Sequence, residues 1–189
     1  MVTFGGTGVM LLGIGVAGVL CALLGLALAR PLGWVSGFAI VGFVWSVVVI
    51  ALVTLVPTSP DTGFVPAETR MTSCSWDIGG PAPDGFWILQ SGQRTLNTVL
   101  FVPAGALLVL AVARWRTGWL LAPAGLLGLA AYSAMIEITQ LELARIDRAC
   151  DVTDVIDNTT GAVFGAVLGL VAVVVLRPWR HRQAKLRKR

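Results

Sequence analysis

Charged residues are scarce in this chain. Only 13% of its 189 residues are Asp, Glu, Lys or Arg, whereas 56% are hydrophobic. Soluble globular domains carry about 25% charged residues, so this scarcity excludes an ordinary soluble domain. The composition is that of an integral membrane protein.

Histidine and established catalytic motifs are also missing. The single histidine, His181, lies in the C-terminal tail, which excludes histidine-based catalysis on the face where the other polar residues gather. The sequence contains no G-x-S-x-G motif, no phosphate-cradling glycine loop and no established metal-ligand spacing. It therefore predicts no metal and no cofactor.

Five apolar segments are long enough to cross a bilayer. A spanning helix needs about 20 apolar residues, because the hydrocarbon core is about 30 Å thick. We therefore predict an all-α integral membrane protein, with one domain at 1–189 built as a bundle of about five transmembrane helices. The segments are 8–29, 34–56, 95–113, 118–141 and 157–176.

The basic residues predict how the bundle is oriented. With five crossings, Arg30, Arg114, Arg116 and the tail at 177–189 fall on one side, which carries no acidic residue. Short loops with positive charge stay in the cytoplasm, so we expect the N-terminus outside the cell and the C-terminus inside. The polar segment 57–94 is then a long outer loop. The tail should lie on the anionic inner leaflet, and nucleic-acid binding is disfavoured because no recognition element accompanies it.

The three cysteines are too few for a disulfide scaffold. Cys21 lies inside the first apolar segment and is expected to be a small packing residue. Cys74 and Cys150 both fall in predicted outer loops, where an oxidising exterior permits a disulfide. We predict that bond, with two free thiols as the alternative.

Two predicted helices carry polar residues near their outer ends. Glu137 and Gln140 share one face of segment 118–141. A carboxylate in a membrane helix costs about 2.5 kcal/mol or more at the bilayer centre and marks a functional site by default. A structural hydrogen bond is the alternative for Glu137. Asn97 must face the bundle interior, since an unpaired amide in hydrocarbon is costly, and its default role is to join helices.

The stretch between the last two segments gathers most of the other charges. Arg145 lies there among several acids, and aspartates near 153–154 can cap the start of the fifth helix. Asp154 and Asn158 share a face with a glycine ridge that lets a neighbouring helix approach closely. We therefore expect these two side chains at a tight helix crossing beside Glu137. The ridge consists of Gly161, Gly165 and Gly169.

The second half of the chain contains an ordered set of polar and small residues: Asn97, FVPAG at 101–105, Glu137, Gln140, Arg145, Asp151, Asp154, Asn158, Gly161 and Gly165. This set, which covers about residues 94–176, resembles the VanZ-like family of small bacterial membrane proteins. The resemblance implies a multi-pass protein of the bacterial plasma membrane with a role at the cell envelope. The namesake of that family is an accessory protein of resistance to lipid-tailed glycopeptides of the teicoplanin type, with an undefined mechanism.

One functional hypothesis is a binding protein of the envelope. A polar pocket at the outer face would bind or mask a surface component, such as a lipid-linked glycan or a lipid-tailed glycopeptide antibiotic. The acidic outer face would attract a cationic ligand. Ligand-binding residues would be Asn97, Gln140, Arg145, Asp151 and Asn158.

The alternative hypothesis is an enzyme of the outer leaflet that acts on a lipid-linked or sugar substrate. Glu137 would be its general acid or base. Asp154 would be the paired carboxylate, or a divalent-metal ligand with Asn158, and Arg145 would hold a phosphate. A transporter, which five helices could form as a homodimeric pore, is less favoured, because four of the five segments carry no deep charge. The sequence leaves open whether a homodimer forms.

Overall fold

The computed structural model describes residues 5–57, 73–78, 92–142 and 150–179. Each helix in this part of the chain is long and apolar enough to cross a membrane. These residues contain no strand beyond an isolated bridge, so the predicted all-helical membrane fold is confirmed. The helices are α1 (Thr7–Leu32), α2 (Trp34–Leu55), α3 (Gly92–Val112), α4 (Gly118–Glu142) and α5 (Val152–Leu176).

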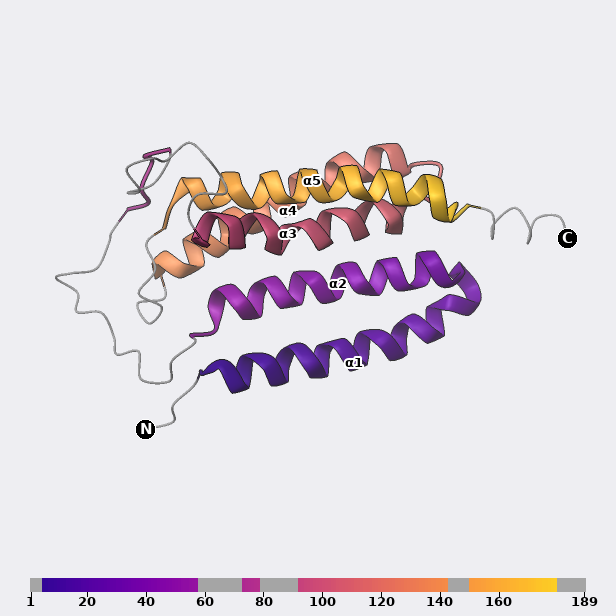
Figure 1. The fold of residues 1–189 in the computed structure, drawn as a ribbon, viewed down its shortest axis with the longest axis horizontal. Helices are drawn as coiled ribbons and strands as arrows, with labels where there is room; N and C mark the ends of the chain where they lie inside the picture. Colours follow the sequence, from indigo (N-terminus) through magenta and orange to yellow (C-terminus); the bar gives the residue numbers. More distant parts are fainter. Residues whose placement is uncertain (1–4, 58–72, 79–91, 143–149, 180–189) are drawn as a thin grey trace, which may run out of the picture.

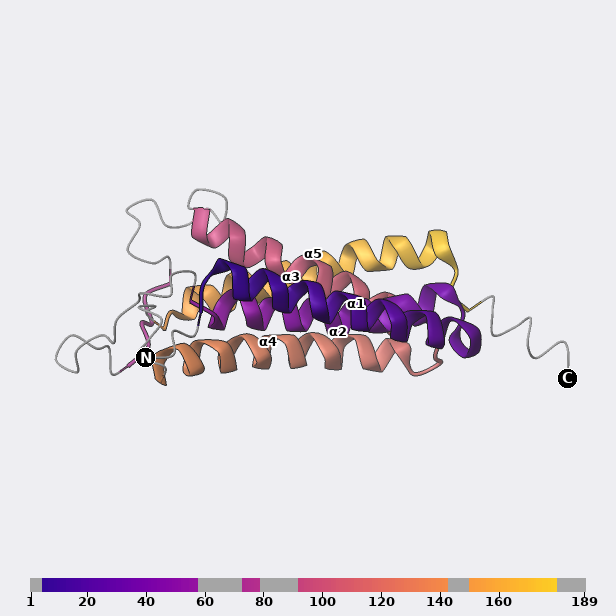
Figure 2. The ribbon, with the colours of Figure 1, turned by 90° about the horizontal axis from the view of Figure 1, so that it is seen from below.

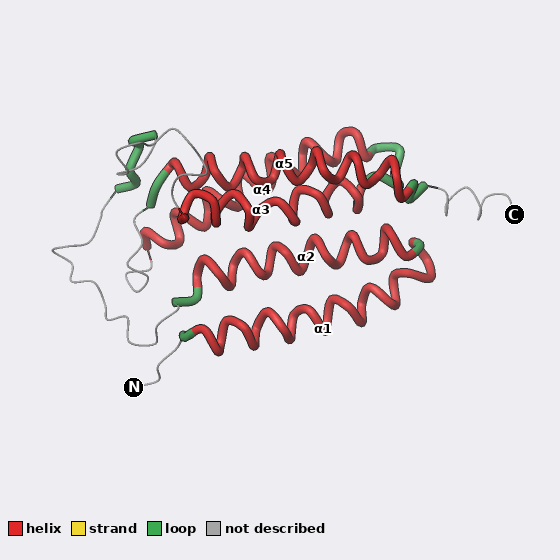
Figure 3. Tube along the Cα trace, in the orientation of Figure 1, coloured by secondary structure: helices red, strands yellow, loops and turns green. Residues whose placement is uncertain are grey.

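The helices run along one common direction (Figures 1 and 3). α1 and α2 form a hairpin, and α3, α4 and α5 lie on the other side of α2, with α4 on one flank of this group in the turned view (Figure 2). The end at the left of Figure 1 holds the starts of α1, α3 and α5 and the ends of α2 and α4. We call it the polar end.

The opposite end of the bundle holds the α1–α2 turn, the α3–α4 turn and the end of α5 (Figure 1). We call it the basic end, because Arg30, Arg114, Arg116 and Arg177 lie in or beside these segments. The fold thus brings together the arginines on which the predicted orientation depends. The orientation in a membrane stays a prediction.

α3 and α5 form the most extensive helix pair of the bundle. A Cβ atom at Gly161 would overlap the carbonyl oxygen of Thr98, and one at Gly165 would overlap that of Val102. A Cβ at Gly169 would lie 2.6 Å from the Ala106 oxygen. Glycine is therefore required along this line, because small residues let helix backbones touch in lipid. The sequence predicted the glycine ridge but did not identify the helix that packs against it, which is α3.

The core lies where α2, α3, α4 and α5 meet. Ile50 and Phe101 are fully buried and pack with Leu129 and Ile136. α1 packs against α2 and buries only Gly25 and Ala29. In a bilayer the other apolar side chains of α1 face lipid, which explains their exposure here.

A single residue, Gly33, connects α1 to α2. Its φ of 85° and ψ of 153° lie in a region that L side chains avoid. The α3–α4 turn lies beside this link, since Arg114 Nη1 donates a 2.8 Å hydrogen bond to the Leu32 oxygen. The two turns of the basic end are thereby joined.

Gly161→Ala tests the backbone contact between α3 and α5. The added methyl group would meet the Thr98 carbonyl, and overpacking of this kind costs about 1–3 kcal/mol. The unfolding temperature and the yield of folded protein in detergent should both fall. Gly128→Ala is the matched control, because a Cβ at Gly128 meets no described atom within 4 Å. An unchanged unfolding temperature for Gly161→Ala would contradict the packing.

Candidate functional site

A buried ion pair joins α3 to α5 at the polar end. Arg94 Nε lies 2.8 Å from Asp157 Oδ2, and Arg94 Nη2 lies 3.0 Å from Asp157 Oδ1. The Asp157 side chain is 0% exposed and that of Arg94 is 13% exposed. A two-pronged contact of this kind fixes geometry as well as charge. The ion pair joins α3 and α5 one helical turn before Gly161.

Glu137 of α4 holds the start of α5. Its Oε2 accepts a 3.1 Å hydrogen bond from the Asp151 backbone nitrogen. Asp151 is itself the N-cap of α5, because its Oδ1 accepts a 2.8 Å hydrogen bond from the Thr153 nitrogen. Such a cap satisfies one of the free amides at a helix start and stabilises it by about 1 kcal/mol. The buried carboxylate of Glu137 therefore positions the capping residue.

Two amide side chains complete the buried cluster. Gln140 Nε2 donates to the Thr54 oxygen of α2 at 2.9 Å. Asn158 Nδ2 donates to Ser133 Oγ of α4, also at 2.9 Å. Both amides are at most 5% exposed. They tie α4 to α2 on one side and to α5 on the other.

A short extended segment, residues 73–78, lies beside the start of α5 (Figure 1). A disulfide joins Cys74 to Cys150, with their Cα atoms 4.6 Å apart. Ser75 pairs with the chain beside Asp151, donating to the Cys150 oxygen at 2.8 Å and accepting from the Val152 nitrogen at 3.1 Å. The segment is therefore fixed to the bundle by covalent and backbone contacts.

The structure brings together most, but not all, of the residues predicted for the site. Glu137, Gln140, Asp151 and Asn158 lie in the cluster. Asn97 is half-buried one turn before Phe101, and its amide makes no hydrogen bond to a described residue. Arg145 lies outside the described residues, so its predicted role stays a prediction.

The buried acid of α5 is Asp157, whereas Asp154 is only half-buried in the first turn. Sequence reasoning did not assign a role to Asp157 or to Arg94. Helical spacing could have found Asp157, because it lies four residues before Gly161 and so shares its face. Nothing in the sequence names Arg94 as its partner, since that choice depends on which helix packs against α5.

The carboxylates of the cluster make contacts within the protein. Its two deepest carboxylates, Glu137 and Asp157, both accept hydrogen bonds from the protein. Among the residues that the structure describes, no group of three His, Cys, Asp or Glu side chains could hold a metal ion. Two cavities lie instead at the basic end, lined by residues 114–117 and by residues 32–36 with 176–178. The predicted outer pocket would involve residues outside the described ranges and stays a prediction.

Comparison with known protein families identified a match. The family model of VanZ/LLP1 matches residues 43–174, from the middle of α2 nearly to the end of α5. The matched region therefore starts earlier than the region at about 94–176 whose residues resemble the family, and it also includes the second half of α2. No curated protein and no solved structure matches the chain.

Asp157→Asn tests the buried ion pair. The change removes the charge that compensates the Arg94 guanidinium, and breaking such a pair costs about 3 kcal/mol. The unfolding temperature in detergent should fall. Replacing both partners by apolar residues, Arg94→Met with Asp157→Leu, should recover much of the loss. Equal unfolding temperatures for the wild type and Asp157→Asn would contradict the pairing.

Counting reactive thiols tests the disulfide. In the denatured protein without reductant, a maleimide should add only to Cys21, the free cysteine. After reduction it should add to all three cysteines, and intact mass distinguishes one adduct from three. Three adducts before reduction would show that Cys74 and Cys150 are free thiols.

Proposed function

The chain belongs to the VanZ/LLP1 family, and we propose that it acts as a binding protein at the outer face of the bacterial plasma membrane. Its polar end would bind or mask an amphiphilic component of the cell surface. The proposal includes the orientation argued from the arginines, with the polar end outside and the basic end in the cytoplasm.

The observation that carries this proposal is the amphipathic segment 73–78. Trp76 is 79% exposed and Ile78 is 76% exposed, with the exposed Asp77 between them. The Asp77 backbone oxygen accepts a 3.2 Å hydrogen bond from Thr153 Oγ1, so α5 holds this residue in place. Exposed aromatic and aliphatic groups on a fixed support are typical of binding surfaces, because little entropy is lost when they bind.

The chemistry of this surface selects a ligand class. In the proposed orientation Trp76 and Ile78 would offer apolar contact near the level where a bilayer meets water, a level that Trp favours. Asp77 and the half-buried Asp154 contribute negative charge, which attracts a cationic group. A molecule with an acyl chain and an amine fits both features. Lipid-tailed glycopeptides of the teicoplanin type and lipid-linked glycans with amino groups belong to this class.

An outer-leaflet enzyme with Glu137 as general acid or base receives less support. Glu137 is 4% exposed, and its carboxylate accepts a hydrogen bond from the Asp151 backbone nitrogen. A general acid or base must reach the substrate within hydrogen-bond distance. Reaching Glu137 would require the start of α5 to move.

A binding titration tests the proposal. The full-length protein in nanodiscs should bind a teicoplanin-type lipoglycopeptide more tightly than the same peptide core without its acyl chain. Trp76→Ala should weaken binding about tenfold, equivalent to 1.4 kcal/mol, because an anchor residue of this kind carries much of the contact energy. Fluorescence or calorimetric titration gives both dissociation constants.

Trp119→Ala is the matched control for this titration. Trp119 is 74% exposed, close to the 79% of Trp76, but it lies at the start of α4 at the basic end. Its loss should leave affinity unchanged. Equal weakening by both variants would indicate general membrane partitioning. No binding by the wild type, together with a new envelope lipid or glycan mass that disappears with Glu137→Gln, would instead establish the enzyme.

A further inference from the structure

A second polar feature lies at the basic end, far from the surface just described. A cavity of about 190 Å³ opens between the α1–α2 turn and the C-terminal turn of α5, lined by residues 32–36 and 176–178. One water needs roughly 10–15 Å³ measured in this way. The cavity is therefore large enough for a tetrahedral anion such as a phosphate group.

Ser36, which lines this cavity, has an unused hydroxyl group. The residue is 1% exposed, and its Oγ has no hydrogen-bond partner among the described residues. The other two hydroxyl residues of α2 are also buried, and each bonds the carbonyl one turn earlier, Ser46 that of Gly42 and Thr54 that of Ile50. An unpaired buried hydroxyl costs about 1–3 kcal/mol. A ligand that forms a hydrogen bond with this hydroxyl would remove that cost.

The break between α1 and α2 explains why Ser36 lacks the usual partner. The carbonyl one turn before Ser36 belongs to Leu32, the last residue of α1, which the non-helical Gly33 separates from α2. The Ser36 hydroxyl therefore has no carbonyl of its own helix one turn earlier, and it is unpaired in the lining of the cavity.

The start of α2 also lines this cavity. The first amides of a helix have no acceptor within it, and no side chain caps α2, whose N-cap is Gly33. Trp34, Val35 and Ser36 form this first turn and line the cavity. The positive end of the helix dipole favours an anion there. The hydroxyl and the helix start thus present donors to one space.

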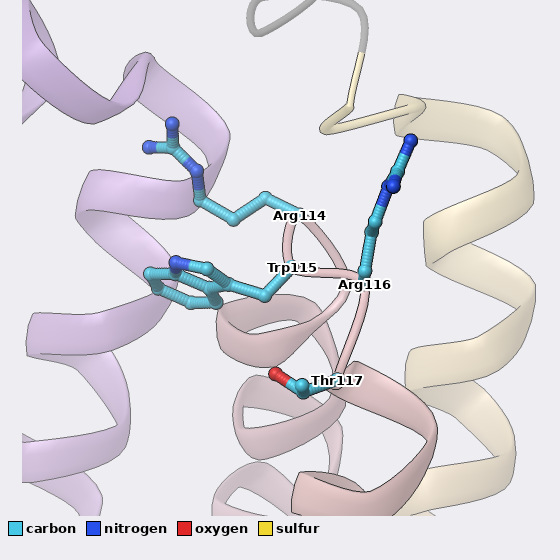
Figure 4. A pocket seen from close by; sticks show the side chains of 4 residues that line it. All are labelled: Arg114, Trp115, Arg116 and Thr117. Atoms are coloured by element: carbon cyan, nitrogen blue, oxygen red, sulfur yellow. The ribbon is translucent and has the colours of Figure 1, made fainter.

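Positive charge surrounds this space. Arg177 lines the cavity, and Figure 4 shows Arg114 reaching toward the α1–α2 helices while Arg116 points toward the end of α5. A neighbouring cavity of about 420 Å³ is lined by these two arginines with Trp115 and Thr117. The sequence has no Asp or Glu before residue 61 or after residue 157. The cavity therefore has donors and positive charge without a competing acid.

We propose that this cavity binds the phosphate group of an anionic phospholipid, with Ser36 Oγ and the first amides of α2 as donors and Arg177 as the counter-charge. Trp34 is 66% exposed and stacks on Phe38, with ring centroids 5.7 Å apart. These rings continue from the cavity along the apolar face of α2 and offer a path for an acyl chain. This path favours a lipid over free phosphate as the source of the group.

Lipid titration of the full-length protein in detergent tests the site. Phosphatidylglycerol should bind, as seen by native mass spectrometry and by a raised unfolding temperature, and phosphatidylcholine should bind more weakly. Ser36→Ala and Arg177→Gln should each weaken phosphatidylglycerol binding about tenfold, since each removes a charge-assisted contact. Without lipid, Ser36→Ala should be at least as stable as the wild type, because it removes an unpaired hydroxyl.

Two matched variants complete the test. Ser46→Ala removes a serine of the same helix whose hydroxyl is bonded within α2, and Arg116→Gln removes an arginine at the same end that does not line this cavity. Ser46→Ala should bind phosphatidylglycerol as the wild type does, and Arg116→Gln, which removes only a more distant charge, should weaken binding less than Arg177→Gln does. Competition by millimolar inorganic phosphate, lost in Ser36→Ala, would support the anion site and assign free phosphate as its source. Wild-type affinity in Ser36→Ala and Arg177→Gln, or equal weakening by Arg116→Gln, would overturn the proposal.

Discussion

The backbones of α3 and α5 touch along the glycines at 161, 165 and 169, and the positions of the polar side chains follow from this contact. Lipid offers no hydrophobic gain for bringing helices together, so close backbone approach must supply the attraction. The crossing buries Asp157 against Arg94. It also places the start of α5 beside α4, where Glu137 bonds the capping residue Asp151. The outer segment 73–78 then attaches to a start of α5 that is already fixed.

Much of this architecture could be predicted from composition and spacing. Helix number followed from five apolar runs, and the glycine ridge followed from its four-residue period. Glu137 and Gln140 stood out because polar groups are costly in an apolar helix. The ion pair was harder to predict, because Arg94 fell one residue outside the predicted third helix while the observed α3 begins at Gly92. The partner of Gln140 is a backbone oxygen of Thr54, which residue types alone cannot reveal.

The two ends of the bundle differ in chemistry, and this difference underlies both proposals. The polar end holds buried acids and amides beneath an exposed Trp76 and Asp77. The basic end holds arginines, an uncapped helix start and the unpaired hydroxyl of Ser36. A surface that binds amphiphiles with amines and a site that binds anionic headgroups suit opposite faces of one membrane. Both proposals depend on the same orientation of the chain.

Cysteine labelling in intact cells tests that orientation most directly. Gly92→Cys places a thiol at the polar end, where an added Cβ meets no described atom within 4 Å, and Thr117→Cys places one on an exposed residue of the basic end. In a Cys21→Ser background, a membrane-impermeant maleimide should label Gly92→Cys in intact cells and Thr117→Cys only after permeabilisation. Labelling of Thr117→Cys in intact cells, with Gly92→Cys protected, would place the basic end outside and contradict the account.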